Sequence, residues 1–158
     1  MTSTIFVVDE NRAIASSMAE VLNGCGPEFQ TLTCGSPYGA VQLAQAVRPN
    51  LVLMDATADP RGAVLCGLAL REFYSVHVVF MTLDPVLDRI LIHSLSRNGR
   101  PFPVLKKSIE PLELVKEVRQ YTGNCNLPAS LPNFSKETYC RGVQRRTRTE
   151  AIQYRMHR

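Results

Sequence analysis

The chain has 158 residues, a formal net charge of +4 and a hydrophobic content of 45%. This length suggests one domain with room for an appendage, and the hydrophobic content argues against a disordered chain. No apolar run approaches the ~20 residues that span a bilayer, and the first residues lack the basic-then-apolar pattern of a signal sequence. We therefore expect a soluble, cytoplasmic protein with no membrane partner.

The positive charge is concentrated near the C-terminus. Residues 124–158 contain seven Lys and Arg against two Asp and Glu, a balance of +5, whereas residues 1–123 contain 11 against 12, a balance of −1. The five cysteines are odd in number and form no C-x-x-C pair. We expect them to be reduced thiols with no metal site.

Four apolar segments and one less apolar segment, residues 29–33, alternate with five amphipathic ones. The expected strands are residues 4–8, 29–33, 51–55, 76–81 and 102–105, and the expected helices are roughly 12–22, 37–47, 63–73, 85–98 and 111–122. Segment 51–55 opens with four consecutive apolar residues, which is typical of a strand buried on both faces. Strands that alternate with helices through short connections predict a doubly wound parallel α/β sheet.

Polar side chains follow these strands where each one ends. Asp9 and Glu10 follow the first strand, Asp55 ends the third, Thr82 follows the fourth and Lys106 follows the fifth. The carboxyl ends of parallel strands share one edge of the sheet, where such folds bind ligands. Three carboxylates there would repel one another, and Mg²⁺, which prefers oxygen ligands, would relieve the repulsion.

The same set could support phosphoryl transfer, which depends mainly on positioning and charge stabilisation. Asp55 could accept the phosphoryl group as a nucleophile. Lys106 could place a positive charge beside a phosphoryl oxygen, and the Thr82 hydroxyl could donate a hydrogen bond to another.

Each of these residues also has a purely structural interpretation. Asp55 could cap a turn, Asp9 and Glu10 could cap the first helix, and Lys106 could be a solvated surface residue. The combination of all of them, in this order along the chain, favours a shared site.

Four segments carry a resemblance to a known family: Val7-Val8-Asp9-Glu10, Leu51-Val52-Leu53-Met54-Asp55, Val78-Val79-Phe80-Met81-Thr82 and Val104-Leu105-Lys106. In this order they resemble the receiver domain of bacterial two-component response regulators, over roughly residues 3–122. The resemblance implies a flavodoxin-like five-stranded sheet of order 2-1-3-4-5, followed by a basic C-terminal extension in residues 124–158.

The resemblance also implies an activity. Asp55 would accept a phosphoryl group from a sensor histidine kinase or a phosphotransfer protein, assisted by Thr82 and Lys106. The implied Mg²⁺ site comprises Asp9, Glu10, Asp55 and Thr57. Such a domain is a signalling module in a phosphorelay, and not an enzyme beyond self-phosphotransfer and autodephosphorylation.

The chain departs from the usual receiver pattern near its end. Lys107 stands where proline usually follows the lysine, Pro103 stands where an aromatic residue is common, and Arg100 replaces a small residue after Gly99. An alternative is therefore a pseudo-receiver, a protein-interaction module that signals without phosphorylation. A nucleotide-binding enzyme of the same topology is disfavoured, because the chain has no Gly-rich phosphate loop.

Residues 124–134 contain two prolines and are predicted to be a linker. Ser135 could cap a helix through much of 136–157, where arginines alternate with Tyr139 and Tyr154. We expect this tail to bind a downstream protein or a second copy of the chain, or nucleic acid. The lack of a helix-turn-helix motif favours a protein.

Overall fold

The structure is a computed structural model, and it describes residues 2–96 and 101–123. The predicted linker and tail helix, and the departures noted at Gly99 and Arg100, lie outside the described residues. Within the described part of the chain, no helix is both long enough and apolar enough to cross a membrane.

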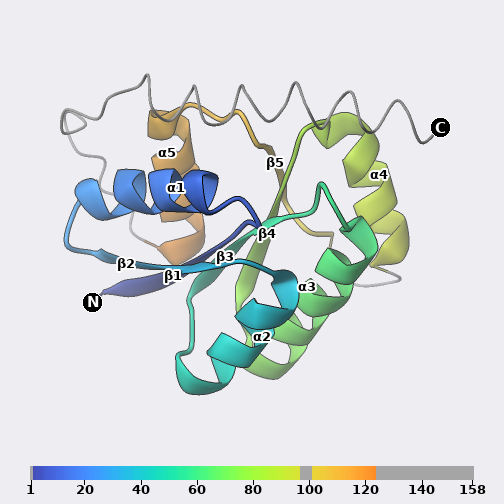
Figure 1. The fold of residues 1–158 in the computed structure, drawn as a ribbon, viewed down its shortest axis with the longest axis horizontal. Helices are drawn as coiled ribbons and strands as arrows, with labels where there is room; N and C mark the ends of the chain where they lie inside the picture. The colour runs from blue at the N-terminus through green and yellow to red at the C-terminus, as the bar shows by residue number, and fades with distance from the viewer. Residues whose placement is uncertain (1, 97–100, 124–158) are drawn as a thin grey trace.

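Within the described residues, five strands and five helices alternate, as predicted (Figure 1). The strands are β1 (Ser3–Val8), β2 (Phe29–Cys34), β3 (Leu51–Asp55), β4 (His77–Thr82) and β5 (Val104–Lys106). The helices are α1 (Arg12–Gly24), α2 (Pro37–Ala46), α3 (Pro60–Tyr74), α4 (Pro85–Leu95) and α5 (Pro111–Thr122). The strands pair in parallel in the order β2-β1-β3-β4-β5, which confirms the predicted fold class.

Several boundaries differ from the expected ones by a few residues, and two of these differences have local chemical reasons. Helix α3 begins at Pro60 and not near residue 63, because the Asp59 side chain accepts a hydrogen bond from the Gly62 amide and proline suits the first turn of a helix. Strand β5 begins at Val104. Phe102, expected in the strand, instead packs its ring edge-on against Phe80, with 4.9 Å between ring centroids.

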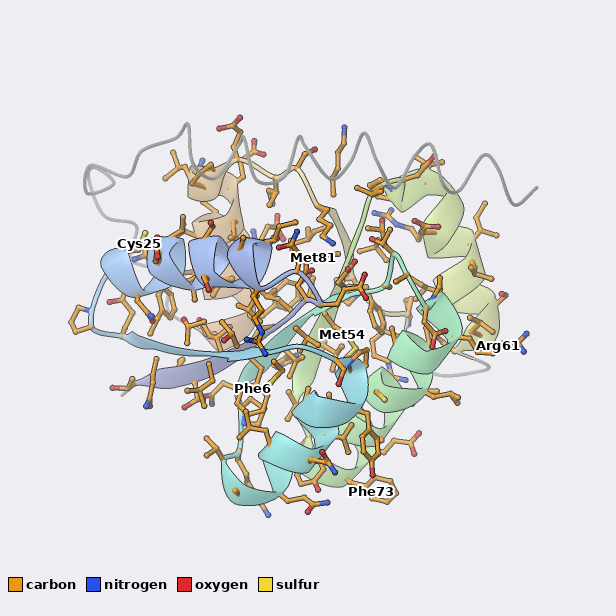
Figure 2. The ribbon with its side chains drawn as sticks, viewed as in Figure 1. Phe6, Cys25, Met54, Arg61, Phe73 and Met81 are labelled. Atoms are coloured by element: carbon orange, nitrogen blue, oxygen red, sulfur yellow. The ribbon has the colours of Figure 1, made fainter. Side chains whose placement is uncertain are left out.

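The sheet lies between two helical layers, with α1 and α5 on one face and α2, α3 and α4 on the other (Figure 1). Side chains along each strand alternate between the two layers, as the period of two requires. In Figure 2, Phe6 and Met54 lie on the α2 side of the sheet, whereas Met81 lies on the α1 side. The core on the α1 side also contains Ile5, Val7, Leu51 and Leu53.

Three cysteines fall within the described residues, and all are free thiols. Burial raises the pKa of each thiol, at Cys25, Cys34 and Cys66. A raised pKa lowers the thiolate fraction at neutral pH, so these cysteines are poor nucleophiles.

Candidate functional site

A buried lysine joins the carboxylates at the ends of two central strands. Nζ of Lys107 lies 2.9 Å from Oδ2 of Asp9, which follows β1, and 2.7 Å from Oδ2 of Asp55, which ends β3. The side chains of Lys107 and Asp9 are 1% and 3% exposed, and that of Asp55 is 7% exposed. The residues therefore form one ion-paired cluster at the carboxyl edge of the sheet.

The other carboxylate oxygens also have partners. Oδ1 of Asp55 accepts hydrogen bonds from the Thr57 amide at 3.0 Å and from the Thr57 hydroxyl at 2.6 Å. Oδ1 of Asp9 accepts one from the Asn11 amide at 2.8 Å. The loops after β1 and β3 thus hold both carboxylates in fixed orientations.

Electrostatics couples the members of this cluster. Burial, followed by the nearby Asp55 charge, raises the pKa of the Asp9 carboxyl, and Lys107 opposes that rise only in part. Burial alone would lower the pKa of Lys107, but attraction to Asp55 and Asp9 outweighs it and the pKa is raised. Lys107 is therefore charged at neutral pH, and with both carboxylates ionised the cluster carries a net charge of −1.

The lysine expected in the site was Lys106, and that assignment is wrong by one residue. Lys106 is exposed and ends β5, where it is paired in register with Thr82. The next residue, Lys107, continues the ladder through a 2.7 Å hydrogen bond from its amide to the Thr82 carbonyl, and its side chain enters the site.

Side-chain alternation explains which lysine enters the site. Leu105 packs against the core on the α1 side, and a residue two positions further along a strand points to the same face. Asp9 follows Val7 and Asp55 follows Leu53 by the same spacing, and both of those residues belong to that core. This spacing was the sequence signal that could have identified Lys107.

Thr82 lies at the same edge of the sheet and is fully buried. Because side chains alternate along a strand, it points to the opposite face from Met81, which precedes it. Its hydroxyl has no hydrogen-bond partner of good geometry among the described residues. The Asp88 carboxylate of α4 lies within hydrogen-bonding reach of this hydroxyl. Burial raises the pKa of Asp88, outweighing the Asp84 backbone and the Thr82 hydroxyl, which both favour the charged carboxylate. Thr82 thus brings a buried hydroxyl to the edge of the site, with the Asp88 carboxylate within reach.

The expected metal set is only partly assembled. Glu10 is exposed, and no three His, Cys, Asp or Glu side chains within the described ranges are grouped closely enough to hold a metal ion. Asp9 and Asp55 remain as buried oxygen donors, and the −1 balance of the cluster is favourable for a divalent cation. Mg²⁺ keeps several waters and is commonly held by only one or two carboxylates, so the donors present fit this ion.

If Lys107, and not Lys106, is the lysine of the site, each position compared with the usual receiver pattern moves by one residue. Ser108, and not a proline, follows the lysine, and no peptide bond in the described part of the chain is cis. Val104, a buried aliphatic residue, occupies the position three before the lysine, where an aromatic residue is common.

No protein-family model matches the chain. Among curated proteins, the DNA-binding response regulators MtrA of Mycobacterium leprae and Mycolicibacterium paratuberculosis are each 29% identical to it over 120 residues, covering 75% of this chain and 51% of the relative. The chain therefore spans about half the length of the curated relatives it matches.

Solved structures agree on the fold. A response regulator from Thermotoga maritima superposes with a TM-score of 0.66 at 18% identity, over 78% of this chain and 99% of that one. The chemotaxis protein CheY4 of Vibrio cholerae gives a TM-score of 0.65 at 16% identity, over 77% and 99%. The chain has the fold of a CheY-like receiver domain.

The comparisons confirm the resemblance to response-regulator receivers. The relatives and the superposed proteins are named as response regulators or chemotaxis proteins.

Proposed function

We propose that this chain is a receiver that accepts a phosphoryl group on Asp55 from a sensor histidine kinase or a phosphotransfer protein. The observation that carries the proposal is the Asp9–Lys107–Asp55 cluster at the carboxyl edge of the sheet. Lys107 takes the role that the sequence suggested for Lys106. The chain acts as a phosphoacceptor in signalling, and not as an enzyme on other substrates.

In the proposed transfer, a carboxylate oxygen of Asp55 forms the new P–O bond. The P–N bond of the donor phosphohistidine breaks, and the imidazole leaves with the electron pair and takes up a proton. Lys107 keeps a positive charge beside the reacting oxygens, where such charge lowers the barrier. The buried Thr82 hydroxyl would donate a hydrogen bond to a phosphoryl oxygen.

Asp9 and Asp55 would hold Mg²⁺, with Glu10 and Thr57 contributing from the same two loops. When bound, Mg²⁺ supplies positive charge that stabilises the phosphoryl oxygens. The protein's part is to keep both carboxylates oriented, through the Asn11 and Thr57 hydrogen bonds.

A pseudo-receiver remains the second candidate, because the switching positions are unusual. Val104 replaces an aromatic residue, and Ser108 follows the lysine through a trans peptide bond. A module of this kind would keep the fold and signal through protein contacts alone.

Incubation with a small phosphodonor and Mg²⁺, followed by intact mass measurement, separates the two candidates. We expect the mass of one phosphoryl group on wild type and none on Asp55→Asn. Asp59→Asn, a change at an exposed carboxylate in the same loop, is the matched control and should be modified like wild type. Unmodified wild type, or modified Asp55→Asn, would favour the pseudo-receiver.

The tail is proposed to be an interaction segment. Its +5 balance suits an acidic protein surface, on a downstream partner or a second copy, and also suits nucleic acid. The MtrA relatives are named as DNA-binding, but they are about twice as long as the matched region. We favour a protein surface for this chain.

A further inference from the structure

A polar pocket lies at the amino edge of the sheet, opposite the Asp9–Lys107–Asp55 cluster. Its volume is about 380 Å³, which falls within the range of small-molecule sites. It is built where α2 leads into β3, where α3 leads into β4, and at the last turn of α5. We call it the amino-edge pocket, and its lining includes Arg48, Asn50, Tyr74, Ser75, His77 and Tyr121.

Hydrogen bonds hold the base of this pocket in place. The Asn50 amide donates to the Thr4 carbonyl at 2.7 Å, and Oδ1 of Asn50 accepts from the Thr4 amide at 2.8 Å. The His77 amide donates to the Asn50 carbonyl at 3.3 Å. The rings of His77 and Tyr121 face each other at an angle of 45°, with 6.2 Å between their centroids. The pocket is therefore preformed on backbone that the sheet fixes.

Arg48 gives the pocket its positive charge, with the His77 imidazole beside it. Among the described residues, no Asp or Glu lines the pocket, and Arg48 forms no ion pair. The other charged side chains on the adjoining turns cancel in sign, as Arg71 with Glu72, Lys116 with Glu117 and Arg119 with Glu28.

The helix ends limit how much negative charge the pocket can accept. Both α3 and α5 end at this edge, and the C-terminus of a helix carries a partial negative charge. These two ends repel a polyanion. The pocket therefore suits a ligand with a single negative charge, placed at Arg48, where a guanidinium can hold a carboxylate through two parallel hydrogen bonds.

Aromatic side chains form much of the remaining wall. Tyr74 and Tyr121 are half-buried and His77 is exposed, and such rings favour another ring at a centroid distance of about 4.5–7 Å. Burial, followed by the nearby Glu117 charge, raises the pKa of the Tyr121 phenol. That hydroxyl is therefore protonated at neutral pH and can donate a hydrogen bond. A planar ring next to the anionic group would match this wall.

Ser75 has an unusual backbone conformation for its residue type. With φ of 56° and ψ of 38°, it is the one residue other than glycine that has a positive φ in the described part of the chain. This left-handed conformation is strained for a residue with a Cβ and unstrained for glycine, which is the usual residue where a helix ends in this way. The strain keeps an exposed hydroxyl on the wall of the pocket, and strain of this kind is common at functional sites.

We propose that the amino-edge pocket binds a small aromatic carboxylate. The carboxylate would bind to Arg48, the ring would pack against Tyr74 and Tyr121, and a polar substituent on the ring would reach the Ser75 hydroxyl. The ligand would thus occupy the edge of the sheet that is remote from Asp55. The proposal does not depend on phosphorylation of Asp55 or on the tail.

Saturation-transfer NMR on the full chain tests the class of ligand, because it detects weak binding. The probe is 4-hydroxybenzoate, whereas 4-hydroxybenzyl alcohol has the ring without the charge and acetate has the charge without the ring. We expect 4-hydroxybenzoate to bind with a Kd of about 1 mM or lower, and the other two to bind at least about tenfold more weakly. Equal binding of either comparison compound, or no binding of the probe up to about 10 mM, would overturn the proposal.

Two variants test whether the probe binds in this pocket. Arg48→Gln should weaken binding about tenfold, because a hydrogen bond between charged groups is lost. Arg61→Gln, at an exposed arginine in the first turn of α3 on the opposite edge of the sheet, is the matched control and should bind like wild type. Wild-type affinity in Arg48→Gln, or an equal loss in Arg61→Gln, would overturn the assignment.

Ser75→Gly distinguishes a binding role of the serine from a structural one. The variant should bind the probe about threefold more weakly, because a neutral hydrogen bond is lost. Its melting temperature without the probe should be unchanged or higher, because glycine adopts the left-handed conformation without strain. A lower melting temperature together with unchanged affinity would show that the serine is only structural, and would overturn the site as proposed.

Discussion

At the scale of single residues, Lys107 holds the site together. It is almost fully buried and neutralises one of the two carboxylates that it contacts. Removing one partner of a buried ion pair leaves an uncompensated charge, which typically costs about 3–5 kcal/mol. Lys107→Met should lower the free energy of unfolding at pH 7.5 by that amount, as measured by urea denaturation.

The neighbouring lysine is the matched control. Lys106 is exposed, so Lys106→Met should change stability by no more than about 0.5 kcal/mol and should leave phosphorylation unchanged. The deficit of Lys107→Met should shrink as the pH falls, because an uncompensated buried carboxylate takes up a proton. Equal losses for the two variants would contradict the assignment of Lys107.

The sequence identifies most of the site, because strand ends converge at one edge of a parallel sheet. The structure brings Asp9, Asp55 and Thr82 to that edge, where this argument expected them, and their part in phosphoryl transfer stays a prediction. The lysine was not predicted correctly, since two adjacent lysines end the fifth strand and only the side-chain alternation from Leu105 distinguishes them. The exposure of Glu10 could not be deduced either, because it depends on how the loop after β1 turns.

At the scale of elements, close packing of α3 against β4 depends on a glycine. A Cβ at Gly67 would lie 2.8 Å from Cζ of Phe80 and 3.4 Å from a methyl of Val78. Phe80 is fully buried and packed against Phe102, so its ring has little room to move. Gly67→Ala should destabilise the protein by about 1–3 kcal/mol through overpacking.

Alanine normally stabilises a helix relative to glycine by about 0.5–1 kcal/mol. Gly39→Ala in α2 provides the comparison, because the new Cβ would meet only the Ser36 hydroxyl oxygen, at 3.1 Å. That variant should be neutral or more stable in thermal melts. A stabilised Gly67→Ala would show that α3 can move away from the sheet.

Helix α5 is tied to the turn before β2 by a buried arginine. Nη2 of Arg119 lies 2.7 Å from Oε1 of Glu28. Burial acts to raise the pKa of Glu28, but hydrogen bonds from its own backbone and from Arg119 outweigh it, and the pKa is lowered below 4.5. A lowered folded-state pKa contributes stability that is present above the unfolded value and lost as the pH falls through the folded one.

Glu28→Gln should therefore lose stability at pH 7 and lose less at a pH below the folded-state pKa of Glu28, where the wild-type carboxylate is protonated. Urea denaturation at the two pH values measures the difference. Glu20→Gln, at an exposed position on α1, is the control and should behave like wild type at both. A deficit for Glu28→Gln that does not depend on pH would mean that packing, and not charge, is what the change removes.

The elements themselves were predicted well, because every strand except β2 is a short apolar run and four of the five helices open on a proline. The errors fell where a side chain or a cap decides the boundary. Asp59 extends α3 toward its N-terminus, and the ring of Phe102 takes its residue out of β5. Such contacts form only in the folded protein, so the local amino-acid sequence does not reveal them.

At the scale of the whole molecule, Mg²⁺ binding at the site, which has a net charge of −1, should stabilise the folded protein. A ligand that binds only the folded state at 100 times its Kd stabilises by about 2.7 kcal/mol. Mg²⁺ should raise the melting temperature of wild type, and Asp9→Asn, which brings the site charge to zero, should remove most of that shift. Asp84→Asn, outside the proposed metal set, should keep it. An equal shift in wild type and Asp9→Asn would contradict the metal assignment.

The paired lysines have a further consequence for β5, a three-residue strand at the edge of the sheet. Sliding a strand by one position turns every side chain to the opposite face. In β5 such a slip would misplace Val104 and Leu105, yet it would bring Lys106 to the position that Lys107 now holds. The positive charge of the site is therefore duplicated in the sequence, and hydrophobic packing alone decides which copy is used.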